Sequence, residues 1–85
     1  MTQEPASLKE MKVGERGRVL GLQAGAGSYR KKLLSMGLTP GAVFTVQRMA
    51  PMGDPVEIAL RGFRLTLRKA EADALAIEPL REDAQ

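Results

Sequence analysis

The stretch of residues 28–41 limits the fold more than any other part of the chain, because it predicts a helix, the end of that helix and a turn. Residues 29–36 contain neither glycine nor proline, and the Ser28 hydroxyl can cap free amides of the first turn. Gly37 can adopt the left-handed conformation that ends many helices, and Leu38 follows where an apolar contact with the last turn is common. The helix is therefore expected to stop abruptly after Met36.

A strand is predicted on each side of this helix. Pro40 has the fixed φ that suits the second position of a turn, and Gly41 tolerates the positive φ of the third, so the chain turns directly into residues 42–49. Those residues are rich in β-formers and alternate in character, with Phe44 and Val46 on one face. Residues 16–23 alternate in the same way before the helix, and either of their faces can be the inner one.

The next segment predicts a β-hairpin. Residues 51–55 hold two prolines around Gly-Asp, which cannot continue a strand ladder and so form a tight loop. Residues 56–60 and 63–68 alternate cleanly and are joined only by Arg61 and Gly62. The alternation assigns one apolar inner face to the hairpin: Val56, Ile58, Leu60, Phe63, Leu65 and Leu67.

Short elements complete the chain. Residues 7–11 predict one helical turn, residues 69–74 a second short helix, and residues 75–78 a last strand that ends at Pro79. About five short strands with Gly and Pro corners in so small a chain favour a mainly β fold, a small barrel.

The length of 85 residues predicts a single domain over residues 7–80, with a flexible lead-in at 1–6 and a frayed tail at 81–85. No signal-like start and no apolar stretch of roughly 18 residues is present, so a cytoplasmic protein is expected. The chain contains neither cysteine nor histidine. The usual zinc ligands and the usual nucleophile-base pairs are therefore missing, and no metal site, cofactor or enzymatic activity is predicted.

Three motifs resemble the ferrous iron transport protein A (FeoA) family. Residues 29–41 are similar to the family's helix and turn, residues 50–56 to its Pro-x-Gly-Asp-Pro loop, and residues 65–72 to its hairpin end and second helix. Together with residues 8–20, the likeness covers about residues 7–80. The order and spacing of the motifs make the resemblance specific, although each motif alone is weak.

The resemblance implies an SH3-like β-barrel of about five strands, with a helix inserted after the first strand and a second short helix before the last. It also implies a cytosolic accessory protein of bacterial ferrous iron uptake, which binds the FeoB permease with its guanine-nucleotide-binding domain and regulates or assembles it. Such a protein would reach the membrane only through its partner. Weak self-association and a weak contact of Fe(II) with carboxylates stay open.

The helix supplies the candidate partner-binding residues. Tyr29, Leu33 and Met36 lie at i, i+4 and i+7 on one row. Leu34 and Leu38, on the adjoining stripe, are expected to cap the barrel. Leu33 either does the same or lies at the rim of a groove, beside Arg30, where a segment of the permease or a second copy can insert.

The basic run on the helix and the loop before the hairpin each have a purely structural interpretation and a functional one. The basic run Arg30-Lys31-Lys32 is either a solvated helix face or a contact for anionic groups. Met52 and Asp54, in the loop before the hairpin, either stabilise the turn, with Asp54 accepting amides within it, or touch the partner.

The sequence pI near 9.7 allows a second function, a basic small barrel that binds nucleic acid. Against it, Phe44 and Phe63 belong to strand faces expected to be buried, so no stacking platform is predicted and nucleic acid is not an expected partner. A third function is a regulatory interaction module, like the similar barrel that ends repressors of the diphtheria toxin repressor type.

Nucleotides and proline-rich peptides are less favoured ligands. The Gly-rich residues 25–28 lack the Gly-Lys-Ser/Thr ending of a phosphate loop. A proline-rich ligand would need several exposed aromatic side chains, which this chain cannot supply.

Overall fold

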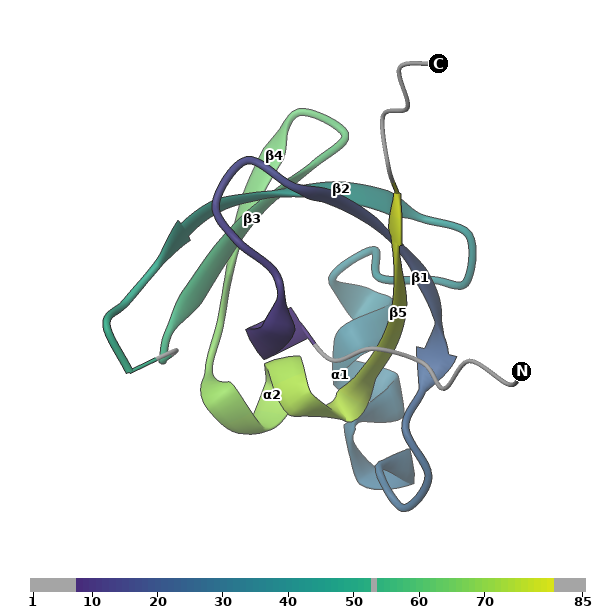
Figure 1. Ribbon diagram of the computed structural model, residues 1–85. Coiled ribbons are helices and arrows are strands. Elements are labelled where there is room, and N and C mark those ends of the chain that lie inside the picture. The colour runs from purple at the N-terminus through teal and green to yellow at the C-terminus, as the bar shows by residue number, and fades with distance from the viewer. Residues whose placement is uncertain (1–7, 53, 81–85) are drawn as a thin grey trace, which may run out of the picture.

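The computed structural model describes residues 8–52 and 54–80 (Figure 1). Five antiparallel strands form one sheet in the order β4-β3-β2-β1-β5. The strands are β1 (Arg16–Leu22), β2 (Val43–Met49), β3 (Val56–Leu60), β4 (Phe63–Leu67) and β5 (Leu75–Leu80). The helical elements are two 3-10 turns, η1 (Leu8–Glu10) and η2 (Gly27–Tyr29), and two α-helices, α1 (Arg30–Ser35) and α2 (Lys69–Ala74). The predicted lead-in at 1–6, Ser7 and the tail at 81–85 lie outside the described residues.

The sheet curls around a single apolar core (Figure 1). Strands β4 and β5 are the two edges of the sheet and do not pair with each other. Helix α2 contacts both of these edge strands as well as η1, so it spans the gap between them. The mainly β, SH3-like fold and the positions of both helices in the chain are confirmed.

Both predicted corners around α1 are confirmed. Gly37 has a φ of 92°, and its N–H donates to the Leu34 carbonyl at 3.0 Å. The Leu38 N–H donates to the Leu33 carbonyl at 3.1 Å, which completes the glycine-based helix end expected from the sequence. In the next turn, the Ala42 N–H donates to the Thr39 carbonyl at 2.9 Å.

The Ser28 cap is wrong. Ser28 lies inside η2, and neither η2 nor α1 has a side-chain cap hydrogen bond. The chain enters α1 through this 3-10 turn, where the Tyr29 N–H donates to the Ala26 carbonyl and the Arg30 N–H to the Gly27 carbonyl. Because backbone carbonyls accept these amides, no hydroxyl cap is required.

The end predicted for the last strand is also wrong, since β5 continues through Pro79 to Leu80 and pairs with β1. Proline cannot donate to a ladder, but an edge strand has one side without a neighbour, where a missing N–H costs nothing. Whether Pro79 can belong to β5 therefore depends on the strand order of the sheet, which the sequence does not reveal.

The hairpin is confirmed, with β3 and β4 joined by Arg61 and Gly62, both of which have positive φ. Its inner face is shorter than predicted, because Phe63 is 69% exposed although Leu60 opposite it is buried. The core therefore ends one residue before the tip of β4. Leu65 is half-buried, and the other predicted inner residues are buried.

Candidate functional site

A groove of about 270 Å³ lies beside α1. One wall comes from the C-terminal end of β1, where the pairing with β5 is irregular between Val19 and Gly21. Helix α1 and the turn at Pro40 supply the rest. The lining residues are Gly21, Leu22, Arg30, Leu33, Leu34, Leu38 and Pro40.

The orientation of α1 decides the open role of Leu33 and contradicts the role predicted for Leu34. Leu33 is 1% exposed and belongs to the core, so it forms the inner part of the groove and not its rim. Leu34, expected to cap the barrel, is 37% exposed. Tyr29 and Met36 are half-buried and pack against the core on the same row as Leu33. The outward apolar residue of α1 is therefore Leu34.

Arg30 is the one ionisable residue in the lining of the groove, and it is exposed. The remaining lining residues are leucines, a proline and a glycine. A volume of this size is below the roughly 300–1,000 Å³ of typical small-molecule sites. The groove is large enough for one or two apolar side chains of a bound segment, and Arg30 could pair with an acidic group beside them.

Lys32 does not belong to a purely solvated run. Its Nζ pairs with the Oε2 of Glu71, which lies on α2 and is 7% exposed. The Oε1 of Glu71 accepts the N–H of Arg68 at 3.0 Å. The hydrogen bond from Lys32, together with the one from the Arg68 amide, lowers the pKa of Glu71 below its usual value of 4.5, against the opposing effect of burial. Glu71 thus connects α1 with the start of α2.

Asp54 makes a contact outside its own loop, which was not expected. Its Oδ1 accepts the N–H of Lys69, the first residue of α2, at 3.0 Å. This bond joins the loop before β3 to the helix after β4. Met52, in the same loop, is 85% exposed.

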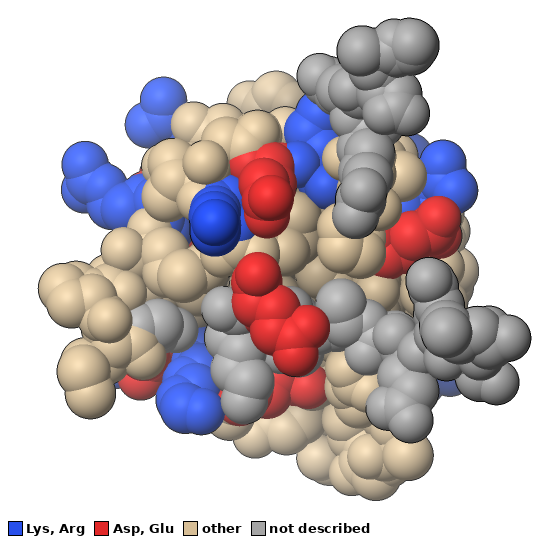
Figure 2. All heavy atoms as spheres, in the orientation of Figure 1, with Lys and Arg blue, Asp and Glu red and all other residues tan. Residues whose placement is uncertain are grey.

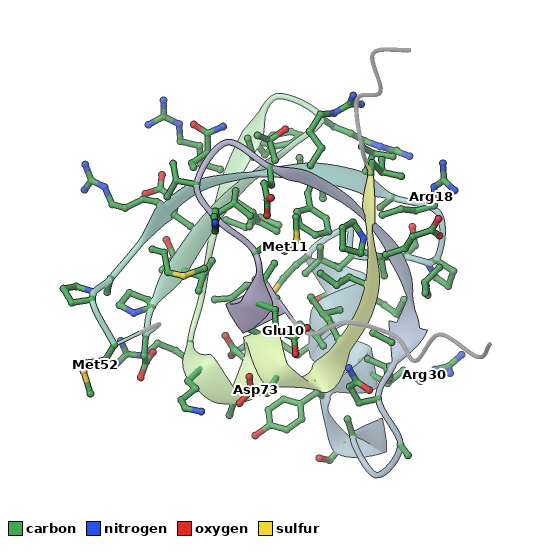
Figure 3. All side chains as sticks on the ribbon, viewed as in Figure 1. Glu10, Met11, Arg18, Arg30, Met52 and Asp73 are labelled. Atoms are coloured by element: carbon green, nitrogen blue, oxygen red, sulfur yellow. The ribbon has the colours of Figure 1, made fainter. Side chains whose placement is uncertain are left out.

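The six candidate partner-binding residues do not form one site. Arg30 and Leu33 share the groove, with Tyr29 and Met36 packed beside them on the core. Met52 lies on the opposite side of the molecule from Arg30 (Figure 3), and Asp54 is engaged with α2. Gly21 interrupts the alternation of β1, and this interruption is the feature of the sequence that marks the groove wall. A groove forms there only because α1 packs beside it.

Charge is unevenly spread over the surface. In the view of Figure 2, Lys and Arg atoms lie mainly at the upper left and upper right, with one group at the lower left, and Asp and Glu atoms lie in the centre, at the right and near the lower edge. Within residues 8–52 and 54–80, no group of three or more His, Cys, Asp or Glu could hold a metal ion. No helix in this part of the chain is both long and apolar enough to cross a membrane.

The family model described as the FeoA domain matches residues 6–79. A curated relative from Porphyromonas gingivalis, the Fe(2+) transport protein A/Fe(2+) transporter FeoB fusion protein, is 30% identical over 77 residues. The match covers 91% of this chain but only 9% of that protein.

Solved structures share the fold along nearly the whole chain. The FeoA-like protein from Clostridium acetobutylicum has 32% identity and a TM-score of 0.82, with 99% of this chain and 96% of that chain covered. The FeoA protein from Chlorobium tepidum has 37% identity and a TM-score of 0.77, with 92% and 73% covered. T. acidophilum IdeR, at 14% identity and a TM-score of 0.80, shares the fold over 94% of this chain and 36% of its own.

Proposed function

The chain belongs to the FeoA family, and from this premise we propose that it is an accessory protein of ferrous iron uptake that binds a FeoB-type permease through the groove beside α1. The binding regulates or assembles the permease, and the protein itself is not the catalyst. The observation that carries this proposal is the similarity of the chain to a protein whose name joins Fe(2+) transport protein A with the transporter FeoB.

The fusion supports an interaction because a covalent link holds two modules at a high effective concentration. Where the modules are separate chains, a binding surface has to supply that proximity. This chain spans only 9% of the length of the fusion protein, so the permease as its partner is part of the proposal.

The groove defines the kind of segment that binds. Leu34 and Leu38 offer apolar contact, and Arg30 offers a cation at the same opening. We expect a permease segment with an apolar side chain next to a carboxylate, so that the first fills the groove and the second pairs with Arg30.

The test uses two variants at the groove, Leu34→Asp and Arg30→Glu. Both side chains are exposed, so the variants should fold, and each should weaken binding to the cytosolic part of the cognate permease by about 10-fold or more in calorimetry. Val13→Asp is the matched control, because Val13 is an exposed apolar residue that does not line the groove. Unchanged affinity in both groove variants would reject the groove as the binding site.

The regulatory part is tested separately by measuring Fe(II) uptake and GTP turnover of the permease with and without the chain. We expect the wild-type chain to change at least one of these rates and Leu34→Asp to lose that effect. If neither rate responds to the wild-type chain, the regulatory role is wrong, whatever the affinity.

A further inference from the structure

The two edges of the sheet are protected to different degrees. Edge strand β5 contains Pro79, its ladder with β1 has a register shift, and its first three residues are buried. Edge strand β4 has neither proline nor lysine, and its five pairs with β3 follow one another without a shift. Prolines, lysines and bulges are devices by which edge strands avoid pairing with another chain. Strand β4 is therefore the edge at which another strand can add.

The register of the hairpin shows which backbone groups of β4 are open. Leu60 and Phe63 flank a two-residue turn, so this pair exchanges backbone hydrogen bonds, and every second pair along the ladder does the same. The amides and carbonyls of Arg64 and Thr66 therefore point away from β3. Within residues 8–52 and 54–80, β4 pairs with β3 alone. Both residues are exposed, so a second strand can reach them.

The inner face of β4 loses its cover toward the tip of the hairpin. Leu67, next to α2, is buried, Leu65 is half-buried and Phe63 is 69% exposed. Alternate residues of a strand share a face, so these three side chains form one row. In Figure 1 the hairpin tip lies at the top of the view and α2 at the opposite end of β4. A strand added at the free edge would bring side chains against Phe63.

We propose that β4 pairs with β4 of a second copy of the chain, antiparallel and with the twofold axis at Leu65. In this register Arg64 of each copy lies opposite Thr66 of the other, so the outward amides and carbonyls of the two strands bond to one another. A register that places Arg64 opposite Arg64 of the second copy sets like charges face to face and is disfavoured. The two sheets of five strands then form one continuous sheet across an isologous interface.

Charge complementarity favours a second copy as the added strand. On the outer face, Thr66 lies opposite Glu57, and Glu57 lies opposite Arg48. The dimer extends this row by Arg64 of the second copy, so that the carboxylate lies between two cations. Glu57 and that arginine are two strand spacings apart, about 10 Å at their Cα atoms, and their long side chains can meet over the short threonine.

The arginine is free to make this contact. Within one copy, Nη1 of Arg64 is 3.9 Å from Oε2 of Glu57, and the arginine side chain is 75% exposed. Such a long and exposed pair contributes little to the fold of the single chain. Arg64 can therefore turn toward the second copy at little cost.

The inner face of the new strand pair is apolar. Leu65 meets Leu65 of the second copy at the axis, and Phe63 lies opposite Leu67 of the second copy, which covers the exposed ring. A strand pair of five residues buries less than the roughly 1,200 Å² of a stable interface, so we expect a weak dimer with a dissociation constant on the order of 100 μM. The proposal concerns the chain alone and does not depend on the permease.

Sedimentation equilibrium of the full chain from about 20 μM to about 1 mM measures the association. Thr66→Pro removes the outward amide but keeps the ladder with β3, because proline is tolerated where an edge N–H faces solvent. We expect its dissociation constant to rise about 10-fold or more, since the bond is lost in both copies, while Thr66→Ala, the matched control that keeps the amide, changes it less than about two-fold. Circular dichroism verifies that both variants fold. Equal constants for the two variants, or a wild-type chain that stays monomeric at about 1 mM, would overturn the proposal.

A charge exchange tests the register and keeps the proposal falsifiable if Thr66→Pro does not fold. Arg64→Glu and Glu57→Arg should each weaken self-association about five-fold, because each places like charges in the row across the axis. An equimolar mixture of the two variants should associate at least as well as the wild-type chain, because every introduced charge then faces an opposite one in the other variant. A mixture as weak as the separate variants would contradict the register.

The chain has no tryptophan, so a single substitution reports on the apolar side of the contact. Phe63→Trp places a fluorophore in the proposed interface, and Met52→Trp is the matched control, since Met52 is exposed outside β4. We expect the emission of Phe63→Trp to shift to the blue as the protein concentration rises, and that of Met52→Trp to stay constant. Emission of Phe63→Trp that does not depend on concentration would contradict the burial of this residue in the dimer.

Two further outcomes would assign the surfaces differently and so overturn the proposal. Self-association that Leu34→Asp abolishes and Thr66→Pro leaves intact would place the contact at the groove beside α1. A chain that stays monomeric, but whose Thr66→Pro variant binds the cytosolic part of the permease less tightly, would assign the β4 edge to the permease.

Discussion

The two α-helices are both six residues long, but they are held in different ways. At the start of α2, Glu71 accepts the Arg68 amide and Asp54 accepts the Lys69 amide. At the start of α1, backbone carbonyls alone accept the amides, and its defined end is the glycine turn after Met36. Helix α2 also contacts both edge strands of the sheet, whereas α1 forms a wall of the groove.

This difference assigns a structural role to α2 and a binding role to the outward face of α1. Changes around α2 should mainly alter the stability of the fold, because its polar contacts join segments that are distant in the chain. Changes on the outward face of α1 should mainly alter binding, because Leu34 contributes less to the core than Leu33. The following variants test that division.

The largest effect is expected inside α1 itself. Leu33→Asp puts a carboxylate at a fully buried apolar position, which should lower the free energy of unfolding by about 4 kcal/mol or more and leave little folded protein. Leu34→Asp, one residue later, should cost about 1 kcal/mol or less. Urea unfolding followed by circular dichroism compares the two, and equal losses would contradict the assigned orientation of α1.

An intermediate effect is expected for Glu71→Gln. Glutamine can still accept the Arg68 amide but loses the ion pair with Lys32, so we expect a loss of about 1–2 kcal/mol at neutral pH.

The pH dependence gives the sign of the Glu71 contribution. Because the pKa of Glu71 is lower in the folded chain than its usual 4.5, the stabilisation is complete above that value and disappears as the pH falls through the folded pKa. Urea unfolding at neutral pH and at about pH 3 should therefore show the difference between wild type and Glu71→Gln shrinking in acid. A difference that stays constant would mean that the charge of Glu71 does not contribute.

The smallest effect is expected for Asp54→Ala, which removes the acceptor of the Lys69 amide and should cost about 0.5–1 kcal/mol. Asp54→Asn keeps a side-chain oxygen and should retain much of that stability. Thermal unfolding of the two variants makes the comparison. If alanine and asparagine are equivalent, the bond to α2 contributes nothing.

The sequence predicted the elements well because their signals are local. The helix end at Gly37 and the hairpin turn at Arg61-Gly62 depend on residues a few positions apart, and both are confirmed. One local prediction failed, the Ser28 cap, because the chain enters α1 through η2. Two other misassignments concern the surroundings of a residue. Pro79 is tolerated because β5 is an edge strand, and Phe63 is exposed because the core ends before the tip of β4.

For the candidate site, the sequence left Leu33 open between the core and the rim of a groove, and the structure buries it and leaves the neighbouring Leu34 more exposed. Arg30 and Leu33 do line the groove, but Gly21 and Leu22 come from β1 and were not foreseen. The bonds between Lys32 and Glu71 and between Asp54 and Lys69 were also missed. No periodic pattern relates residues that are so far apart in the chain.

By itself, the sequence determined the family, the five strands and the position of α1 with its glycine end, because turns and alternation are properties of neighbouring residues. Tertiary structure alone decided which side of α1 faces the core. Leu33 and Leu34 are equally apolar and lie about 100° apart around the helix, so either can point inward as far as the sequence is concerned. Packing against the curled sheet buries Leu33 and leaves Leu34 at the groove, where a partner can reach it.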